Sequence, residues 1–314
     1  MAIMWFMMPG PPPITVDDPG EGGTRITLND RPANFFPGKG DGPRPAILML
    51  GGSEGGLRES QNETARRFAD LGFSVLYVGY YRTTEETKSF HMVPLETFDA
   101  AMEWLLGRDD IDPSRIAMMG TSKGGEGALL YASRNPAISA VVANVPANAV
   151  WQGFDWEEFD RSKFESSWSV GGEPVPYLPY VELEWYEWFG LDGVGEMYSL
   201  SLDQLPDHPE AAIRVEDIDG PILMLCGEQD SLWPSCRMSR AAQERARAAG
   251  KSEVEVIAYE DAGHMMFGKP LDPSDENYEN LARMGGTPEG NNEARKQSFP
   301  AIAAFLQTAL AEGD

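Results

Sequence analysis

The sequence is short of positive charge, and this shortage excludes two classes of partner. Its 314 residues include 25 Lys and Arg against 50 Asp and Glu, which gives a net charge of −25 at pH 7. A nucleic acid backbone or an anionic membrane surface would be repelled by such a chain. We therefore expect no nucleic acid and no membrane as a partner. Whether the chain forms a homo-oligomer is left open.

Histidine and cysteine are also scarce. Three histidines and two cysteines are scattered along the chain and form no ligand cluster, so we expect no metal site and no cofactor. Cys226 lies in an apolar run, where a small buried hydrophobe is a better interpretation than a disulfide partner. Unpaired cysteines favour a reducing compartment, and we expect a cytoplasmic protein.

Long apolar runs are missing as well. None approaches the ~20 residues that a membrane-spanning helix needs. The apolar start, MAIMWFMMPGPPP, has no basic residue and leads into a proline cluster. We therefore expect no signal peptide.

The pattern that is present is an alternation of strands and helices. Residues 1–44 are rich in Pro and Gly and hold one strand-like stretch at 25–28, which indicates an N-terminal arm or edge strands. From residue 45, apolar runs of strand length alternate with segments of helical spacing, which predicts an α/β fold with a mostly parallel, doubly wound sheet. The expected strands cover 46–50, 74–78, 115–119, 138–144, 221–226 and 253–259, and the expected helices cover 60–72, 94–106, 123–134, 236–249 and 292–311.

Residues 151–219 interrupt this alternation. They contain five of the eight tryptophans, and 17 acidic against three basic residues. A structureless loop of this length is improbable inside a compact domain. We interpret it as an aromatic, acidic cap inserted between core segments 45–150 and 220–314, over the carboxyl ends of the strands. The alternative is an acidic surface insertion whose aromatic residues form only their own small core.

The central motif is Gly120-Thr-Ser122-Lys-Gly124. It follows an expected strand and precedes an expected helix, which is the context of the nucleophile elbow G-x-S-x-G in α/β-hydrolases. Such a turn lifts the Ser122 hydroxyl to the top of the sheet, at a helix N-terminus that favours a developing negative charge. The motif predicts that Ser122 is a nucleophile.

A serine nucleophile needs a base and an acid, which follow it in that fold in the order Ser, acid, His. Asp230 comes just after the strand 221–226, and His264 just after the strand 253–259. Both therefore belong to the edge of the sheet that carries Ser122. We expect His264 to be the base and Asp230 to hold it, with Glu228 as the rival acid.

An acyl-transfer site also needs donors for the oxyanion. One is expected to be the N–H of Lys123, the residue after the nucleophile. The other belongs to the glycine-rich loop 51–56, after the first core strand. We choose the Ser53 N–H, with Glu54 as its neighbour. Glu54, Trp151 and His91 are candidates to line the substrate pocket, although a structural or surface role is the favoured interpretation of His91.

These residues resemble the catalytic domain of the acyl-CoA thioesterase and bile acid-CoA:amino acid N-acyltransferase family, within the dienelactone-hydrolase-like α/β-hydrolases. The resemblance places the nucleophile on Ser122, the acid on Asp230 and the base on His264. The similar segments are LGGSEGG (50–56), GTSKGGEGAL (120–129), VPANAVWQG (145–153), SSWSVGGEPVPYLPY (166–180), GEQDSLWPS (227–235), AGHMMFGKP (262–270) and GGTPEGNNEARKQSFPAIAAFL (285–306).

The resemblance implies cleavage of an acyl thioester, in the first instance acyl-CoA, through an acyl-enzyme. Family members with a serine nucleophile tend to hydrolyse, so acyl transfer to an amino acid is the less favoured outcome. The acidity fits poorly with CoA, which is a polyanion. Local cations such as Lys123 or Arg82 are candidates to offset it. A carboxylesterase or lactonase that acts on a small uncharged ester is the alternative.

Overall fold

A computed structural model describes residues 11–158, 160–182 and 194–312 of the chain. In these residues the main sheet has the strand order β1-β2-β4-β3-β6-β7-β10-β11. The pairs β1–β2 and β2–β4 are antiparallel, and every pair from β4 to β11 is parallel. The strands are β1 (Thr24–Leu28), β2 (Arg31–Phe36), β3 (Arg44–Leu50), β4 (Ser74–Val78), β6 (Ile111–Thr121), β7 (Ala140–Asn144), β10 (Ile222–Gly227) and β11 (Val254–Tyr259).

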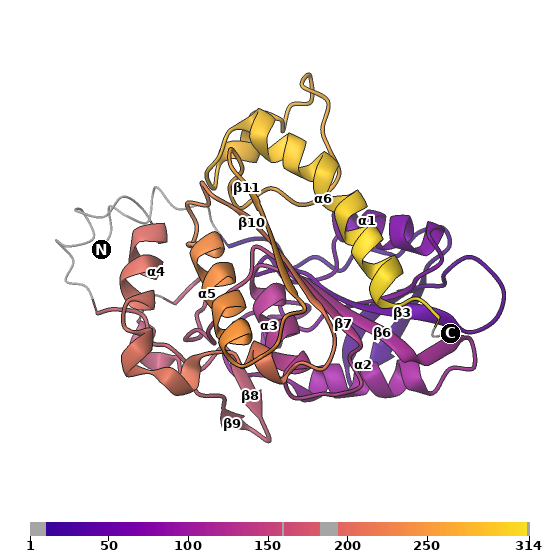
Figure 1. Cartoon of the computed structure of the whole chain (residues 1–314), viewed down its shortest axis with the longest axis horizontal. Coiled ribbons are helices and arrows are strands. Elements are labelled where there is room, and N and C mark those ends of the chain that lie inside the picture. Colours follow the sequence, from indigo (N-terminus) through magenta and orange to yellow (C-terminus); the bar gives the residue numbers. More distant parts are fainter. Residues whose placement is uncertain (1–10, 159, 183–193, 313–314) are drawn as a thin grey trace.

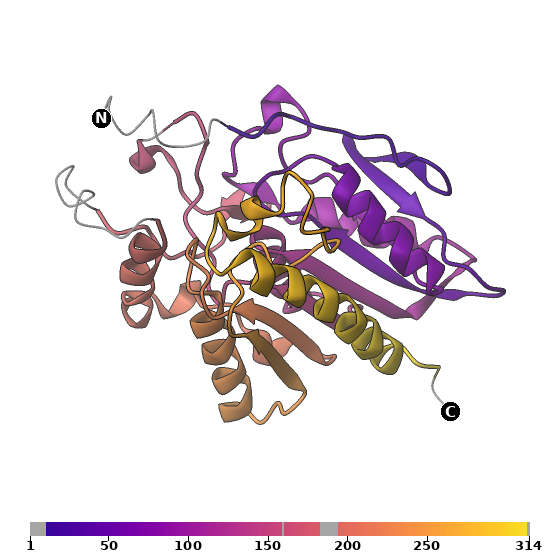
Figure 2. The same ribbon diagram turned by 90° about the horizontal axis from the view of Figure 1, so that it is seen from above.

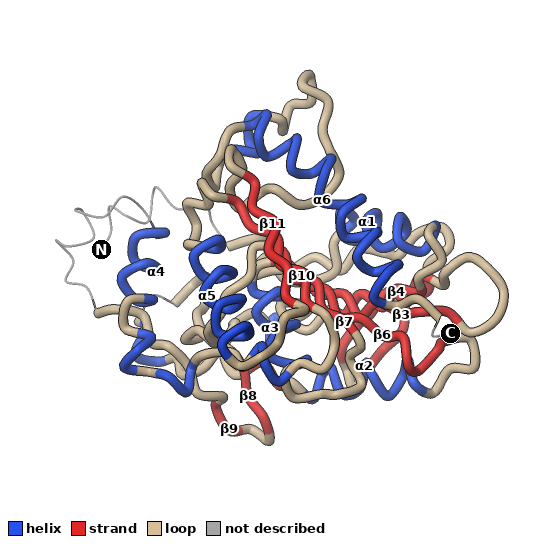
Figure 3. The backbone as a smooth tube through the Cα atoms, in the orientation of Figure 1, coloured by secondary structure: helices blue, strands red, loops and turns tan. Residues whose placement is uncertain are grey.

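Helices cover both faces of this sheet (Figures 1 and 3). α2, α3 and α5 pack on one face, and α1 and α6 pack on the other, where Figure 2 shows them from above. The mostly parallel, doubly wound sheet that the sequence predicts is therefore confirmed. The helices are α1 (Glu59–Asp70), α2 (Glu96–Leu106), α3 (Lys123–Ala132), α4 (Val194–Leu202), α5 (Ser235–Ala248) and α6 (Pro288–Ala309).

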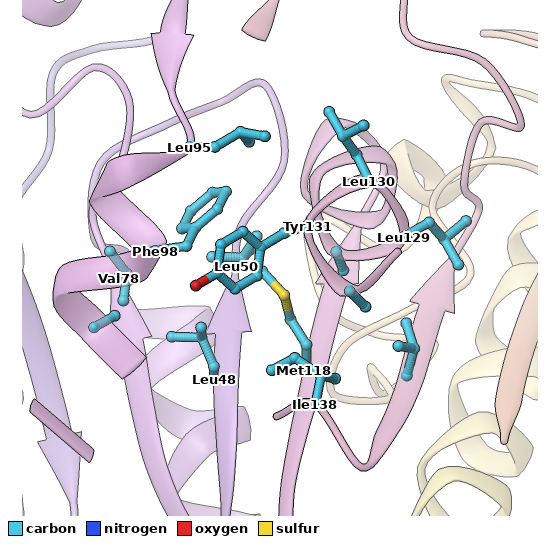
Figure 4. Packing of buried hydrophobic residues seen from close by; sticks show 14 of the residues in the cluster. Leu48, Leu50, Val78, Leu95, Phe98, Met118, Leu129, Leu130, Tyr131 and Ile138 are labelled. Carbon is cyan, nitrogen blue, oxygen red and sulfur yellow. The ribbon is translucent and has the colours of Figure 1, made fainter. Parts of the chain in front are cut away.

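The core is formed by apolar residues that alternate along the parallel strands. Figure 4 shows Leu48, Leu50 and Met118 of the strands packed against Phe98 of α2 and helix α3. The next residue of each strand points to the opposite face, toward α1 and α6. Because both faces are covered, the inner parts of the central strands, such as residues 116–119 of β6, are apolar and buried, and the site lies at the carboxyl ends of these strands.

The described part of 151–219 contains little regular structure. It holds α4, several single-turn 3₁₀ helices, and strands that belong to a second small sheet with β5. Trp151, Leu178 and Met197 of this segment pack with Trp233 and Met238 of the main domain in a separate apolar cluster. The elements of the small sheet are β5 (Val93–Pro94), β8 (Trp168–Val170) and β9 (Glu173–Pro174). The single-turn helices in the described residues are Glu85–Thr87, Arg161–Lys163, Leu205–Asp207, Pro209–Ala211, Val215–Asp217 and Glu279–Ala282.

Cys226 and Cys236 are joined by a disulfide, so the expectation that they stay unpaired is wrong. Cys226 lies in β10 and Cys236 in the first turn of α5. The chain turns back between them, so that α5 packs on β10 and the two Cα atoms lie 5.0 Å apart. The bridge removes the support that unpaired cysteines gave to a reducing, cytoplasmic compartment.

Candidate active site

Ser122 stands at a sharp turn between β6 and α3. Its backbone has φ 56° and ψ −121°, a strained conformation for a residue with a side chain. Neighbouring backbone leaves no room for side chains beside it: a Cβ on Gly120 would lie 2.0 Å from the Gly124 oxygen, and a Cβ on Gly124 would lie 2.2 Å from the Gly51 oxygen. The turn is fixed to β7, because the Ser122 N–H donates to the Asn144 carbonyl at 2.8 Å.

The side chains of Ser122, His264 and Asp230 meet at the carboxyl edge of the sheet. The Nε2 atom of His264 lies 2.9 Å from the Ser122 Oγ, and its Nδ1 lies 2.9 Å from the Asp230 Oδ2. Ser122 is 6% exposed and His264 8%, so bulk water has little access to either. This geometry can move the serine proton to the imidazole while the carboxylate orients the ring.

The loop after β10 orients the Asp230 carboxylate. Its Oδ1 accepts hydrogen bonds from the N–H groups of Leu232 at 3.0 Å and Trp233 at 3.4 Å. The Ser235 hydroxyl donates to its Oδ2 at 2.7 Å. The Trp233 ring then packs edge-on against the His264 ring, with 5.7 Å between centroids. Donors and packing together leave the acid and the base little freedom to rotate.

The rival acid, Glu228, points elsewhere. Its carboxylate is ion-paired with Arg240 of α5, on the exposed side of the same loop. Among the two acidic residues considered from the sequence, only Asp230 contacts His264 in the described structure.

The glycine-rich loop 51–56 lies beside the elbow because β3 and β6 are paired in register, with Leu50 opposite Gly120. A Cβ on Gly52 would lie 3.3 Å from the Ser122 Cβ. The N–H groups of Ser53 and Lys123 donate to no acceptor in the described residues. Both expected oxyanion donors are thus free at the edge of the sheet that carries the serine.

The Lys123 side chain cannot serve as a landing site for an anionic substrate. Its ammonium group is 2.6 Å from the Glu126 carboxylate, and both side chains are buried. It also donates to the Ser167 hydroxyl at 2.9 Å. The Glu126 carboxylate accepts the Trp168 indole N–H at 2.9 Å and the Trp151 backbone N–H at 3.2 Å. Burial lowers the pKa of Lys123 and raises that of Glu126, while each charge opposes the other's shift.

The three candidate pocket residues lie in different surroundings. Glu54 folds back on its own loop, where its Oε1 accepts the Gly52 N–H at 3.2 Å. Trp151 is fully buried and stacks on Tyr180. His91 lies against the Phe164 ring, and burial lowers the pKa of its imidazole.

One contact at the site was not expected from the sequence. The indole N–H of Trp156, in the inserted segment, donates to the Ser53 carbonyl at 3.3 Å. Its only sequence signal was the richness of this segment in aromatic residues. The contact places part of 151–219 directly on the loop that carries the expected oxyanion donor.

Neither a membrane helix nor a metal cluster is found in the part of the chain that the structure describes. No helix there is long and apolar enough to cross a membrane. No group of three or more His, Cys, Asp or Glu there is arranged to hold a metal ion.

Comparison with known proteins gives consistent matches. The family model described as "BAAT / Acyl-CoA thioester hydrolase C terminal" matches residues 93–312. Rat mitochondrial acyl-coenzyme A thioesterase 2 is 31% identical over 82% of this chain and 51% of its own length. Mouse acyl-coenzyme A thioesterase 6 is 28% identical over 97% of this chain and 67% of its own length. The chain thus spans about half to two thirds of these relatives.

Solved structures match the fold over nearly the whole chain. Esterase 2 of Thermogutta terrifontis, phosphorylated by paraoxon, has a TM-score of 0.59 and 14% identity, covering 93% of this chain and 97% of that one. A dienelactone hydrolase-like phosphotriesterase from metagenomic libraries has a TM-score of 0.55 and 16% identity, covering 92% and 98%. These matches confirm the α/β-hydrolase fold.

Proposed function

We propose, because the chain belongs to the BAAT / acyl-CoA thioester hydrolase C-terminal family, that it is a serine hydrolase of acyl thioesters. The observation that carries the proposal is the hydrogen-bonded series Ser122–His264–Asp230 at the turn after β6. The reaction that these three residues would catalyse passes through an acyl-enzyme on Ser122.

In the first half-reaction, the Ser122 Oγ attacks the thioester carbonyl carbon while His264 Nε2 takes the hydroxyl proton. A C–O bond forms, and the carbonyl oxygen becomes an oxyanion to which the N–H groups of Lys123 and Ser53 donate. When the C–S bond breaks, the imidazolium returns its proton to the leaving sulfur. The products are a free thiol and the acyl-serine.

In the second half-reaction, water replaces the thiol. His264 takes a proton from the water as its oxygen attacks the acyl-serine carbonyl, and then returns that proton to the Ser122 Oγ. Asp230 stays ionised throughout and stabilises the imidazolium. The acid product leaves, and the enzyme regains its starting state.

The leaving group is proposed to be CoA, as the names of the relatives suggest. An uncharged ester or lactone is the second candidate, and the net charge of −25 favours it because CoA is a polyanion. Acyl transfer to an amino acid is proposed as a minor reaction at most.

We further propose that residues 45–150 and 220–314 form the catalytic core, 1–44 an N-terminal arm with edge strands, and 151–219 a cap. The cap is supported by two contacts with the core: Trp156 donates to Ser53, and Trp168 donates to Glu126 of the helix after the elbow. Both contacts lie next to an expected oxyanion donor.

The test compares a thioester with an ester of the same acyl group. Purified protein is assayed on butyryl-CoA and p-nitrophenyl butyrate, with Ser122→Ala and Asp230→Asn as variants. We expect hydrolysis of the CoA thioester, its loss in Ser122→Ala, and a fall in kcat of about 10⁴-fold in Asp230→Asn. A preference for the neutral ester by orders of magnitude would replace the thioesterase proposal with the esterase.

A matched variant of the rival acid controls for loop damage. Glu228→Gln removes a carboxylate from the same loop but leaves His264 untouched, so its kcat should stay within a few-fold of the wild type. If Glu228→Gln is crippled while Asp230→Asn is harmless, the assignment of the acid is wrong.

A further inference from the structure

Arg82 holds a buried positive charge without a carboxylate partner in the described residues. It follows β4 at the carboxyl edge of the sheet, with φ 53°, and is only 4% exposed. Its guanidinium donates to two backbone carbonyls, those of Pro12 at 2.8 Å and Lys88 at 3.4 Å. The nearby Glu157 is ion-paired with Lys88 instead. Carbonyl dipoles offset the charge of a desolvated guanidinium only in part. An anion bound here would therefore form a strong, charge-assisted hydrogen bond.

The neighbouring Tyr81 hydroxyl is an unused donor. Tyr81 is 1% exposed, and its buried Oη has no hydrogen-bond partner in the described structure. Burial raises the pKa of this hydroxyl, while the adjacent Arg82 and Trp156 side chains oppose the shift. The phenol is therefore neutral at pH 7 and carries an O–H that can be donated. A buried polar group without a partner is unusual and calls for a reason.

Both residues lie against the loop that carries the Ser53 oxyanion donor. A Cβ on Gly55 would lie 2.4 Å from the Arg82 Cβ and 2.8 Å from the Tyr81 ring. Trp156, whose indole is adjacent to the Tyr81 hydroxyl, donates to the Ser53 carbonyl at 3.3 Å. The cation and the unpartnered hydroxyl thus lie beside the glycine-rich loop that carries the expected oxyanion donor, on the side of β4.

We propose that Arg82 and Tyr81 form an anion-binding subsite for a negatively charged group of the substrate. The group is either a carboxylate at the far end of the acyl chain or a phosphate of the leaving group, since both accept from a guanidinium and a phenol. The inference rests on the proposed function. In the described structure the Arg82 Nε–H donates to the Pro12 carbonyl of the N-terminal arm. An anion that binds to Arg82 replaces this hydrogen bond. The subsite gives a chain with a net charge of −25 a local place for an anionic substrate.

The test uses four thioesters in which the acyl end and the leaving-group end are each either charged or uncharged. They are butyryl-CoA, succinyl-CoA, and the butyryl and succinyl thioesters of N-acetylcysteamine, which lacks the phosphates. The variants are Arg82→Gln, Arg82→Lys and Tyr81→Phe. Arg66→Gln is the control, because it removes the same charge from α1, where that guanidinium is paired with Glu59.

We expect Arg82→Gln to raise KM at least tenfold for the thioesters that carry the recognised anion, and to leave kcat/KM for the uncharged butyryl N-acetylcysteamine thioester within threefold. Loss on both succinyl thioesters alone identifies the acyl carboxylate, and loss on both CoA thioesters alone identifies a phosphate. Arg82→Lys should retain part of the binding. Arg66→Gln should change none of the four reactions.

Tyr81→Phe keeps the test valid if the Arg82 variants fold poorly. Its hydroxyl has no partner to lose, so the melting temperature should not fall, while KM for the recognised anionic thioester should rise severalfold. An equal effect of these variants on all four thioesters, or no effect on any, overturns the subsite.

Failure of the proposed function would give a different result. If the wild type hydrolyses esters but no thioester, the thioesterase proposal falls. The same variants are then compared on p-nitrophenyl butyrate and on the p-nitrophenyl monoester of succinic acid. A selective loss on the charged ester supports the subsite, and an equal response to both esters overturns it.

Discussion

Lys123 has two separate proposed roles, one for its backbone and one for its side chain. In the described residues its backbone N–H donates to no acceptor and is the proposed oxyanion donor, whereas its ammonium is buried against Glu126, which accepts from the backbone N–H of Trp151 and the indole N–H of Trp168. The pair therefore joins the helix after the nucleophile to two points of the inserted segment. Because a buried charge without its partner is costly, the two side chains should be strongly coupled.

The coupling can be measured by a double-mutant cycle. Lys123→Met leaves the Glu126 charge buried and should lower the free energy of unfolding by about 3–5 kcal/mol. Adding Glu126→Gln removes that charge but keeps an acceptor for Trp168, so the double variant should recover most of the loss. Urea denaturation of the wild type, both single variants and the double variant gives the four values. Additive losses would mean that the pair is not coupled.

At the scale of single residues, the position of a residue at the end of a strand could be predicted from the sequence, whereas the direction of its side chain could not. Ser122, Asp230 and His264 each follow a strand of the parallel sheet, so their convergence could be predicted from the sequence. The direction of the Lys123 ammonium could not, because the ammonium donates to Ser167, 44 residues later, and its partner Glu126 accepts from Trp168, 42 residues after Glu126.

At the scale of secondary-structure elements, the Cys226–Cys236 disulfide closes the loop between β10 and α5. This loop carries Asp230, and the bridge spans a sequence separation of 10 residues. Closing a loop of this size in the unfolded chain is worth about 3 kcal/mol in the chain-entropy model. The double variant Cys226→Ala, Cys236→Ala should lose free energy of unfolding of this order.

Urea denaturation of the double variant under oxidising conditions provides the measurement. The wild type in reducing buffer serves as the comparison, because reduction opens the same loop without removing side chains. If the double variant is as stable as the oxidised wild type, the bridge does not stabilise the fold. Its kcat on a thioester also reports whether the loop still positions Asp230.

Three features of the fold escaped prediction, for different reasons. β2 (Arg31–Phe36) contains Pro32 and Asn34, which are rare in strands, and it forms because β1 and β4 pair with it on either side. α6 begins at Pro288, before the expected 292, because Thr287 caps it. The disulfide was missed because the sequence does not show that α5 folds back on β10. β2 and the disulfide depend on contacts between distant segments, whereas the start of α6 is set locally, because the Gly290 N–H donates to the Thr287 hydroxyl.

The whole molecule presents a strongly negative field to its substrate. With a net charge of −25 it repels a polyanion such as CoA, the proposed leaving group, at long range. Raising the salt from about 0.01 M to about 0.15 M shortens the Debye length from about 30 Å to about 8 Å. The kcat/KM for butyryl-CoA should therefore rise severalfold with salt.

The uncharged N-acetylcysteamine thioester is the control for that prediction. Its kcat/KM should stay constant over the same range, because no long-range force acts on it. A parallel rise for both substrates would show that salt acts on the protein rather than on the encounter.

The central claim is that the acyl group passes through Ser122. Its most direct test is rapid quenching of the reaction with butyryl-CoA, followed by intact-protein and peptide mass spectrometry. We predict one added butyryl group, carried by the peptide that contains Ser122 and absent from Ser122→Ala. An acyl group on another residue, or turnover of the thioester by Ser122→Ala, would contradict the account.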